Sequence, residues 1–153
     1  VGDYNVLITK KARNLIIQGL KEGVPAGDLF RAVREAMSEE SDKWIQTVVS
    51  TKTTEFYNRA RKSYWDNDPL ASQIVVAYEY SAVLDDRTTA ICSDLDGKIF
   101  DKGGNIPTPP LHFNCRSDLI PVTVFEDYKA SKNPSPDDLA DMGAGKGFVV
   151  PKF

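Results

Sequence analysis

Apolar positions in the first part of the chain recur at spacings of three and four residues, which is the period of one helix face. The predicted helices cover residues 7–20, residues 25–38 and, after a cap at Ser41 or Asp42, the stretch towards Trp65. Leu29, Val33 and Met37 form the apolar stripe of the second helix. Gly23 favours a left-handed stop before this helix, and Pro25 suits its first turn.

The third helix is predicted to bury an aromatic and aliphatic stripe along its whole length. The side chains expected to point inward are Trp44, Ile45, Val48, Val49, Phe56, Tyr57, Ala60 and Tyr64. The tripeptide Asn67-Asp68-Pro69 is a strong helix breaker. The helical region is therefore expected to cover residues 1–69.

The second half of the chain is rich in β-branched and aromatic residues, which favour strands. The expected elements are a strand over residues 74–84, a short helix over 87–93, a hairpin-type turn at Asp96-Gly97 that leads into residues 98–100, an irregular loop over 101–110 and a strand over 118–125. Together they predict a module over residues 70–128. The fold class is α+β, with the N-terminal helical half packed on this small mixed module of strands, one short helix and ordered loops.

The last part of the chain, residues 129–153, is polar and rich in Pro and Gly, and we expect it to form a docking arm or a mobile end. A net charge of −3 argues against a protein that coats nucleic acid. No apolar run approaches the roughly 20 residues that span a bilayer, so no membrane partner is expected. Two cysteines do not make a disulfide framework, which favours a reducing, intracellular site of assembly.

The most distinctive chemical feature of the sequence is the set of Cys92, His112 and Cys115, which contains both cysteines and the single histidine. Zinc takes about four nitrogen or sulfur ligands in a tetrahedron, and only three are evident. The candidates for a fourth ligand are Ser117, Asp94 and Asp96. Three interpretations stay open: a structural zinc site, a Cys92–Cys115 disulfide, and two reduced cysteines beside a hydrogen-bonded histidine.

The same residues could form a nucleophile and its base, with Asp118 as the orienting group. No nucleophile elbow or protease signature surrounds them, and the proline-bracketed loop is typical of a rigid structure. We therefore predict no catalytic residue.

Four cations in the third helix, Lys52, Arg59, Arg61 and Lys62, are candidates for contact with DNA phosphates or with a protein partner. Nearby acidic residues favour a solvated helix face instead, and Glu55 stands four residues before Arg59 in the order that supports an ion pair. In the module, Asp85 or Asp86 is expected to cap the short helix, and Arg87 to reach Asp94 or Asp96.

An ordered series of short motifs carries a family resemblance. They are Leu84-Asp85-Asp86-Arg87-Thr88, Cys92, Leu95-Asp96-Gly97, Pro109-Pro110-Leu111-His112 and Asn114-Cys115-Arg116, preceded by Thr54-Glu55 and Asn58-Arg59-Ala60-Arg61. Over residues 44–122 the chain resembles the phage Mu F-like minor head proteins, also described as phage head morphogenesis proteins. The family commonly has a cysteine where this chain has Ser117. The residues expected to hold the shape of the module are Asp86, Arg87, Thr88, Asp96, Gly97, Pro110, Asn114 and Arg116, with Cys92, His112 and Cys115 as candidate ligands of a structural zinc.

The resemblance implies a non-enzymatic virion component of a tailed phage or prophage, located inside the head and, during assembly, in the host cytoplasm. Its implied partners are the portal protein and capsid or scaffold proteins, with DNA as a weaker possibility, and the helical half is expected to supply the docking surface. Two alternatives remain at this point. One is an enzyme of toxin or transferase type, and the other is a DNA-binding factor of packaging or ejection.

Overall fold

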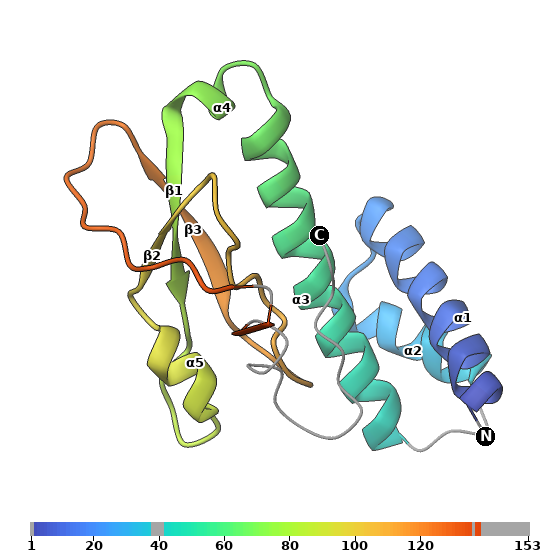
Figure 1. Ribbon diagram of the computed structural model, residues 1–153. Helices are drawn as coiled ribbons and strands as arrows, with labels where there is room; N and C mark the ends of the chain where they lie inside the picture. The colour runs from blue at the N-terminus through green and yellow to red at the C-terminus, as the bar shows by residue number, and fades with distance from the viewer. Residues whose placement is uncertain (1, 38–41, 136, 139–153) are drawn as a thin grey trace.

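The computed structural model describes residues 2–37, 42–135 and 137–138. Its N-terminal half consists of helices α1 (Gly2–Lys21), α2 (Ala26–Ala36) and α3 (Asp42–Asn67). Figure 1 shows α1 and α2 on one side of α3 and a small sheet on the other side. The predicted α+β class is confirmed, since the helices stand in the N-terminal half and the strands follow them.

The three long helices share one apolar core. Its buried side chains are Ala12, Ile16, Leu29, Val33, Met37, Ile45, Val48 and Val49. The stripe predicted for α2 is therefore confirmed. Gly23 ends the first helical segment with φ +71, and Pro25 directly precedes α2, as the sequence indicated.

The inward stripe predicted for α3 is correct only in its first part. Ile45, Val48 and Val49 are buried, but Tyr57 and Tyr64 are 53% and 60% exposed. The second part of α3 buries polar side chains instead. This part of the helix packs against the loop before β3, whose backbone groups have no partner within the sheet.

The module opens with a short helix, α4 (Ala71–Ile74), which the sequence did not predict, and continues into β1 (Val75–Ser81), α5 (Ala90–Leu95), β2 (Ile99–Asp101) and β3 (Asp118–Thr123). The strands form an antiparallel sheet in the order β2-β1-β3. Asp96-Gly97 is a turn, with φ +72 at Gly97, but it joins α5 to β2 and not two strands of a hairpin.

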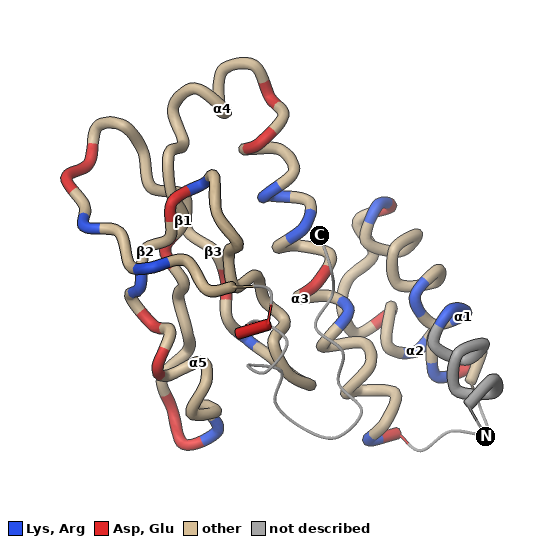
Figure 2. The backbone as a smooth tube through the Cα atoms, in the orientation of Figure 1, with Lys and Arg blue, Asp and Glu red and all other residues tan. Residues whose placement is uncertain are grey.

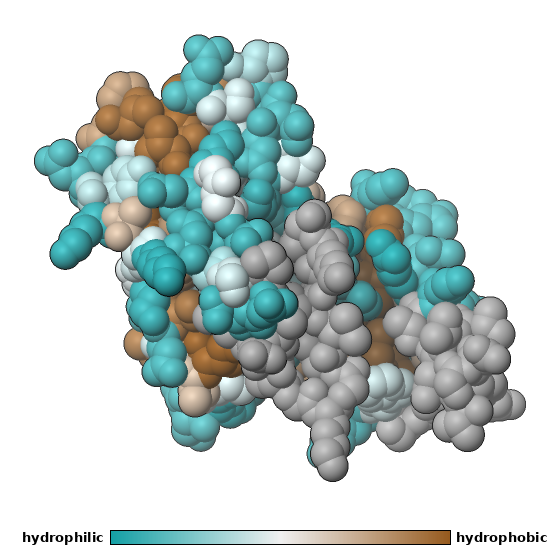
Figure 3. Space-filling model, viewed as in Figure 1, coloured by the Kyte–Doolittle hydropathy of each residue, from teal (hydrophilic) through white to brown (hydrophobic). Residues whose placement is uncertain are grey.

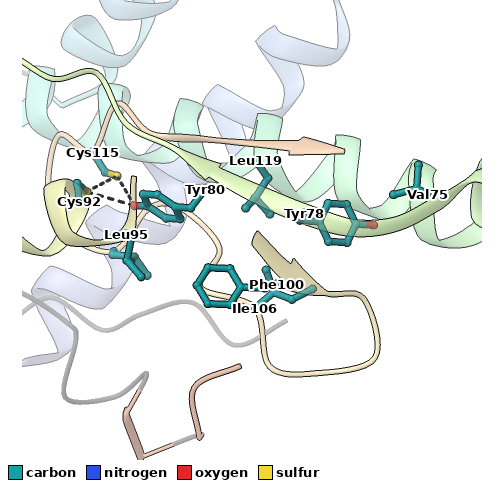
Figure 4. Packing of buried hydrophobic residues seen from close by; sticks show 10 residues of the cluster. Val75, Tyr78, Tyr80, Cys92, Leu95, Phe100, Ile106, Cys115 and Leu119 are labelled. Carbon is teal, nitrogen blue, oxygen red and sulfur yellow. Dashed lines mark hydrogen bonds between the residues drawn. The ribbon is translucent and has the colours of Figure 1, made fainter. Parts of the chain in front are cut away.

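A second apolar core lies on one face of this sheet. Tyr78 and Tyr80 of β1 point into it, together with Phe100 of β2 and Leu119 of β3. Figure 4 shows these side chains in one row that ends at Cys92 and Cys115. The irregular loop before Cys115 is buried from Ile106 to Leu111 and closes the core.

The described start of the C-terminal arm is attached to the module. The Ser131 amide donates to the carbonyl of Ile99 in β2 at 2.7 Å. The Asn133 amide group donates to the carbonyls of Asp101 and Asn105 at 3.1 and 3.2 Å. The Gly-rich part of the predicted arm lies outside the described residues. Among the described residues, no helix combines the length and the apolar character that crossing a bilayer requires.

Candidate functional site

Two separate segments bring Cys92, His112 and Cys115 together. Cys92 comes from α5, while His112 and Cys115 come from the loop before β3. Cys92 Sγ lies 3.1 Å from His112 Nε2 and 3.9 Å from Cys115 Sγ. The three donor atoms all lie within 4.8 Å of one another.

The backbone fixes the tautomer of His112. Its Nδ1 lies 2.8 Å from the carbonyl oxygen of Phe113, which can only accept a hydrogen bond. Nδ1 therefore carries a proton and Nε2 faces the sulfur of Cys92. A histidine held in this way presents the nitrogen lone pair that a metal ion uses.

Tyr80 closes the inner side of the cluster. Its side chain is fully buried, and its hydroxyl lies 3.2 Å from Cys92 Sγ and 4.0 Å from Cys115 Sγ (Figure 4). The sequence did not single out Tyr80. The alternation of buried residues along β1 was the available signal, because it turns Tyr78 and Tyr80 to the same face.

The two thiols differ electrostatically. The hydrogen bond from Cys115 lowers the pKa of the Cys92 thiol, and His112 lowers it further against the effect of burial. The interaction with Cys92, followed by burial, raises the pKa of Cys115. The hydrogen bond with Cys92 also raises the pKa of His112. Cys92 is thus the more acidic thiol of the pair, and deprotonated cysteine is the form that binds metals.

The structure separates the three interpretations that the sequence left open. Both cysteines are free, and their 3.9 Å separation is far beyond the roughly 2.05 Å of a sulfur–sulfur bond. Both are also buried, and a tyrosine and a histidine surround them. The geometry is therefore that of reduced cysteines, which can either stay as a hydrogen-bonded group or hold a metal ion.

The acidic residues proposed near this cluster point elsewhere. Asp94 is exposed on α5, and Asp96 accepts a hydrogen bond from the Ala82 amide at 2.7 Å. Asp118 forms an ion pair with Arg61 of α3. None of the three belongs to the group of candidate metal ligands found among the described residues, so neither a carboxylate ligand nor an orienting aspartate is present in it.

Asp85 and Arg116 form a bidentate ion pair next to the cluster. The Arg116 guanidinium donates to both oxygens of Asp85, at 2.7 and 2.5 Å. This hydrogen bonding lowers the pKa of Asp85. Asp85 also accepts from the Arg87 amide at 2.9 Å, and its own amide donates to Thr88 Oγ1 at 2.8 Å. Arg116 thereby joins the turn before α5 to the loop that carries Cys115.

Two details predicted for this turn are wrong. The N-cap of α5 is Thr89, not Asp85 or Asp86, because residues 85–88 form a separate turn before the helix begins. Arg87 is largely exposed and forms an ion pair with Asp85, 3.7 Å away, and not with Asp94 or Asp96 as predicted.

The remaining motif residues hold the loops in place. Asp96 and Gly97 fasten the end of α5 to β1, since the Gly97 amide donates to the carbonyl of Tyr80 at 2.9 Å. Pro110 is buried after a cis bond to Pro109. Asn114 adopts a left-handed backbone with φ 56 and donates through its side chain to Thr47 of α3 at 3.2 Å.

A polar stripe on α3 binds the loop that carries Cys115. Thr54 donates to the carbonyl of Cys115 at 2.7 Å, and the Asn114 amide donates to Thr51 at 2.9 Å. Asn58 donates to the carbonyl of Ser117 at 3.3 Å and accepts from the Leu119 amide at 3.0 Å. Sequence reasoning missed this role, although the polar spacing of residues 51, 54, 58 and 61 was visible as one helix face.

The four cations predicted to contact DNA or a partner divide between two sides of α3. Lys52 and Arg59 both pair with the buried Glu55, at 2.6 and 3.2 Å, which confirms the predicted pairing of Glu55 with Arg59. Arg61 pairs with Asp118, and Lys62 lies 2.5 Å from Asp66. Figure 2 shows Lys and Arg interleaved with Asp and Glu along α3, and not gathered into one basic surface.

The comparison with protein families shows to which family the chain belongs. The family described as Phage Mu protein F like protein matches residues 10–120, from α1 into β3. The chain belongs to this family. No curated protein and no solved structure matched the chain.

Membership in the Phage Mu F-like family confirms the predicted resemblance and extends it into the helical half. It supports a role in phage head morphogenesis and makes the chain a virion protein. The matched region includes the polar stripe of α3, the Asp85–Arg116 ion pair and all three members of the cysteine and histidine cluster.

Proposed function

We propose that this chain is a non-enzymatic minor head protein that docks on the portal protein or on the inner face of the capsid. The family match over residues 10–120 carries the proposal, because it covers the helical half as well as the module. On this view the protein is present in the host cytoplasm during assembly and inside the head of the finished virion.

The state of the cysteines supports a structural role. Cys92 and Cys115 are 3% and 0% exposed. A thiol nucleophile needs access to its substrate, and the burial of both sulfurs opposes that access. If the chain were a toxin or transferase instead, C92S and H112N would abolish an activity while leaving the thermal unfolding unchanged.

The sequence led us to expect the docking surface in the helical half, but the surface that we propose lies in the module, at the end of the sheet next to α4. Val124 and Phe125, which follow β3, are 51% and 82% exposed, and Leu70 before α4 is 70% exposed. The Val124 amide donates to the carbonyl of Ile74 at 2.9 Å, which brings the two segments to the same end of the sheet. Figure 3 shows apolar surface there. Clustered exposed apolar side chains are typical of protein–protein contact sites.

Co-expression with the portal protein of the same phage tests this proposal. We expect the two proteins to elute together in size-exclusion chromatography, and F125D to weaken the complex by about tenfold or more, as loss of a central aromatic contact does. The control is L84D, since Leu84 is 62% exposed at the opposite end of β1 and should not affect docking. Equal binding by wild type and F125D would reject this surface, and no binding to portal or capsid protein would reject the docking role.

The alternative of a DNA-binding factor has its own test. The four candidate cations each pair with a carboxylate, which leaves little free positive charge for phosphates. We therefore expect no measurable affinity for duplex DNA in a salt series that starts at low ionic strength. A binding constant that falls steeply with salt would favour the DNA-binding role over docking.

A further inference from the structure

We infer that Cys92 Sγ, His112 Nε2 and Cys115 Sγ hold one zinc ion, and that its fourth position opens to a small hollow on the solvent side of the cluster. This inference goes beyond the docking role, and its test needs no partner protein.

The separation of the sulfurs fits zinc. A tetrahedral zinc with zinc–sulfur bonds of ~2.3 Å places two thiolates about 3.8 Å apart. Cys92 Sγ and Cys115 Sγ lie 3.9 Å apart. The same geometry requires about 3.5 Å between sulfur and nitrogen. His112 Nε2 lies 3.1 Å from Cys92 Sγ, about 0.4 Å closer than this separation, and within 4.8 Å of Cys115 Sγ.

The kind of donors also fits zinc. Two sulfurs and one imidazole nitrogen suit zinc better than magnesium or calcium, which prefer oxygen. The Phe113 carbonyl holds the outer nitrogen of His112 at 2.8 Å, which is the supporting contact that metal-bound histidines commonly make. Tyr80 and the apolar core exclude water from the inner side of the cluster.

The fourth position is indicated by the hollow beside the cluster. Its lining includes Cys92, His112, Thr89 and Ser117. Thr89 Oγ1 is buried there and has no hydrogen-bond partner among the described residues. A water on the zinc would fill the fourth position and could bond to this hydroxyl. Ser117 is 4% exposed and contacts Cys92 as well as Tyr80, so position 117 is close enough to supply a protein ligand.

The zinc would act as a structural link. It would join α5, which carries Cys92, to the loop of Cys115, whose carbonyl accepts from Thr54 of α3. Removal of the ion is therefore expected to loosen the loop together with its contact to α3, which hydrogen exchange of the Asn114 and Leu119 amides would report.

The first experiment measures metal in the full chain, purified without chelator and without a nickel column. We expect about one zinc per chain by elemental mass spectrometry, release of that zinc by a thiol-modifying reagent, and a lower melting temperature with excess chelator. Co²⁺ in place of zinc should give the visible absorption of a tetrahedral site with sulfur ligands. Protein that contains no zinc, binds no Co²⁺ and melts at the same temperature with chelator would overturn the inference.

Matched variants make the test independent of folding defects. C92S should lose the zinc, whereas Y80F, which changes a buried neighbour of the same sulfurs, should keep it. The decisive variant is S117C, because a thiolate at this position would replace the water. We expect S117C to hold zinc at least ~10-fold more tightly in competition with a chelator. Unchanged affinity in S117C, or loss of zinc in Y80F to the same extent as in C92S, would contradict the proposed ligand set.

Discussion

Asp66, near the end of α3, shows how a single carboxylate can join the helix to the sheet. The hydroxyl of Tyr78 in β1 donates to it at 2.5 Å, Lys62 lies 2.5 Å away and Lys102 3.6 Å away. Burial alone would raise the pKa of Asp66, but the hydrogen bonds from Lys62 and Tyr78 outweigh it and lower the pKa below the ordinary 3.8. Asp66 is therefore a charged contact between the two halves of the molecule.

This contact makes a pH-dependent prediction. Because the folded-state pKa of Asp66 is depressed, its stabilising effect is present above the unfolded pKa and is lost as the pH falls through the folded pKa. We expect D66N to lower the free energy of unfolding by about 1–2 kcal/mol at pH 7, with a smaller difference below pH ~3. Urea unfolding at several pH values measures this difference, with D94N as the surface control. A difference that stays constant with pH would contradict it.

At the scale of elements, α3 protects an edge of the sheet. β3 is an edge strand, and its Leu119 amide and the Ser117 carbonyl are satisfied by the buried side chain of Asn58. A buried backbone group that loses its partner costs about 1–3 kcal/mol. The helix therefore contributes to the sheet through hydrogen bonds as well as through packing.

We predict that N58A lowers the free energy of unfolding by about 1–3 kcal/mol, since the buried Ser117 carbonyl loses its partner and the Leu119 amide keeps only its bond to the Asp118 side chain. The matched control is N67A at the exposed end of the same helix, where the amide group donates only to Ser63 and the cost should stay below ~0.5 kcal/mol. Chemical denaturation measures both variants. Similar losses for the two asparagines would argue against the role assigned to Asn58.

The arm segment on β2 gives a second prediction at this scale. A Cβ at Gly104 would lie 2.2 Å from Asn133 Nδ2, whereas a Cβ at Gly103 meets nothing within 4 Å. G104A should therefore displace Asn133 from the carbonyls of Asp101 and Asn105, and should increase exchange of the Ser131 amide by about tenfold or more. G103A serves as the control and should leave this amide protected. Unchanged exchange in G104A would show that Asn133 does not hold the arm.

At the scale of the whole molecule, α3 is shared by two cores. Its first part contributes Ile45 to the helical core, and its second part contributes Trp65 to the core of the sheet. Trp65 packs on Tyr78 with ring centroids 5.8 Å apart. The two halves are therefore physically continuous through this helix.

This continuity predicts the behaviour of fragments. A fragment of residues 70–135 lacks the polar stripe and exposes the backbone around Cys115, so we expect no cooperative thermal unfolding. A fragment of residues 42–135 retains α3 and should unfold cooperatively, as followed by circular dichroism. A cooperative transition in the shorter fragment would show that the module folds without the helix.

The sequence by itself determined the features that depend on near neighbours along the chain. Three- and four-residue spacing located the long helices, Gly23 marked the stop before α2, and Asp96-Gly97 marked the turn after α5. These features rest on backbone preferences and on the period of one helix, which act within a few residues. The ordered motifs were sufficient to indicate the family, which the match over residues 10–120 confirms.

Only the tertiary structure decided which partner each polar side chain meets. Thr54 and Cys115 are 61 residues apart in the sequence, and Asp85 and Arg116 are 31 residues apart. The spacing of apolar residues could not show that α3 turns a polar face towards the sheet, because those side chains bind backbone groups that become unpaired only where β3 ends the sheet. The sequence likewise offered Cys92, His112 and Cys115 only as candidates. They form one site with Tyr80 because α5, β1 and the loop before β3 pack together in the tertiary structure.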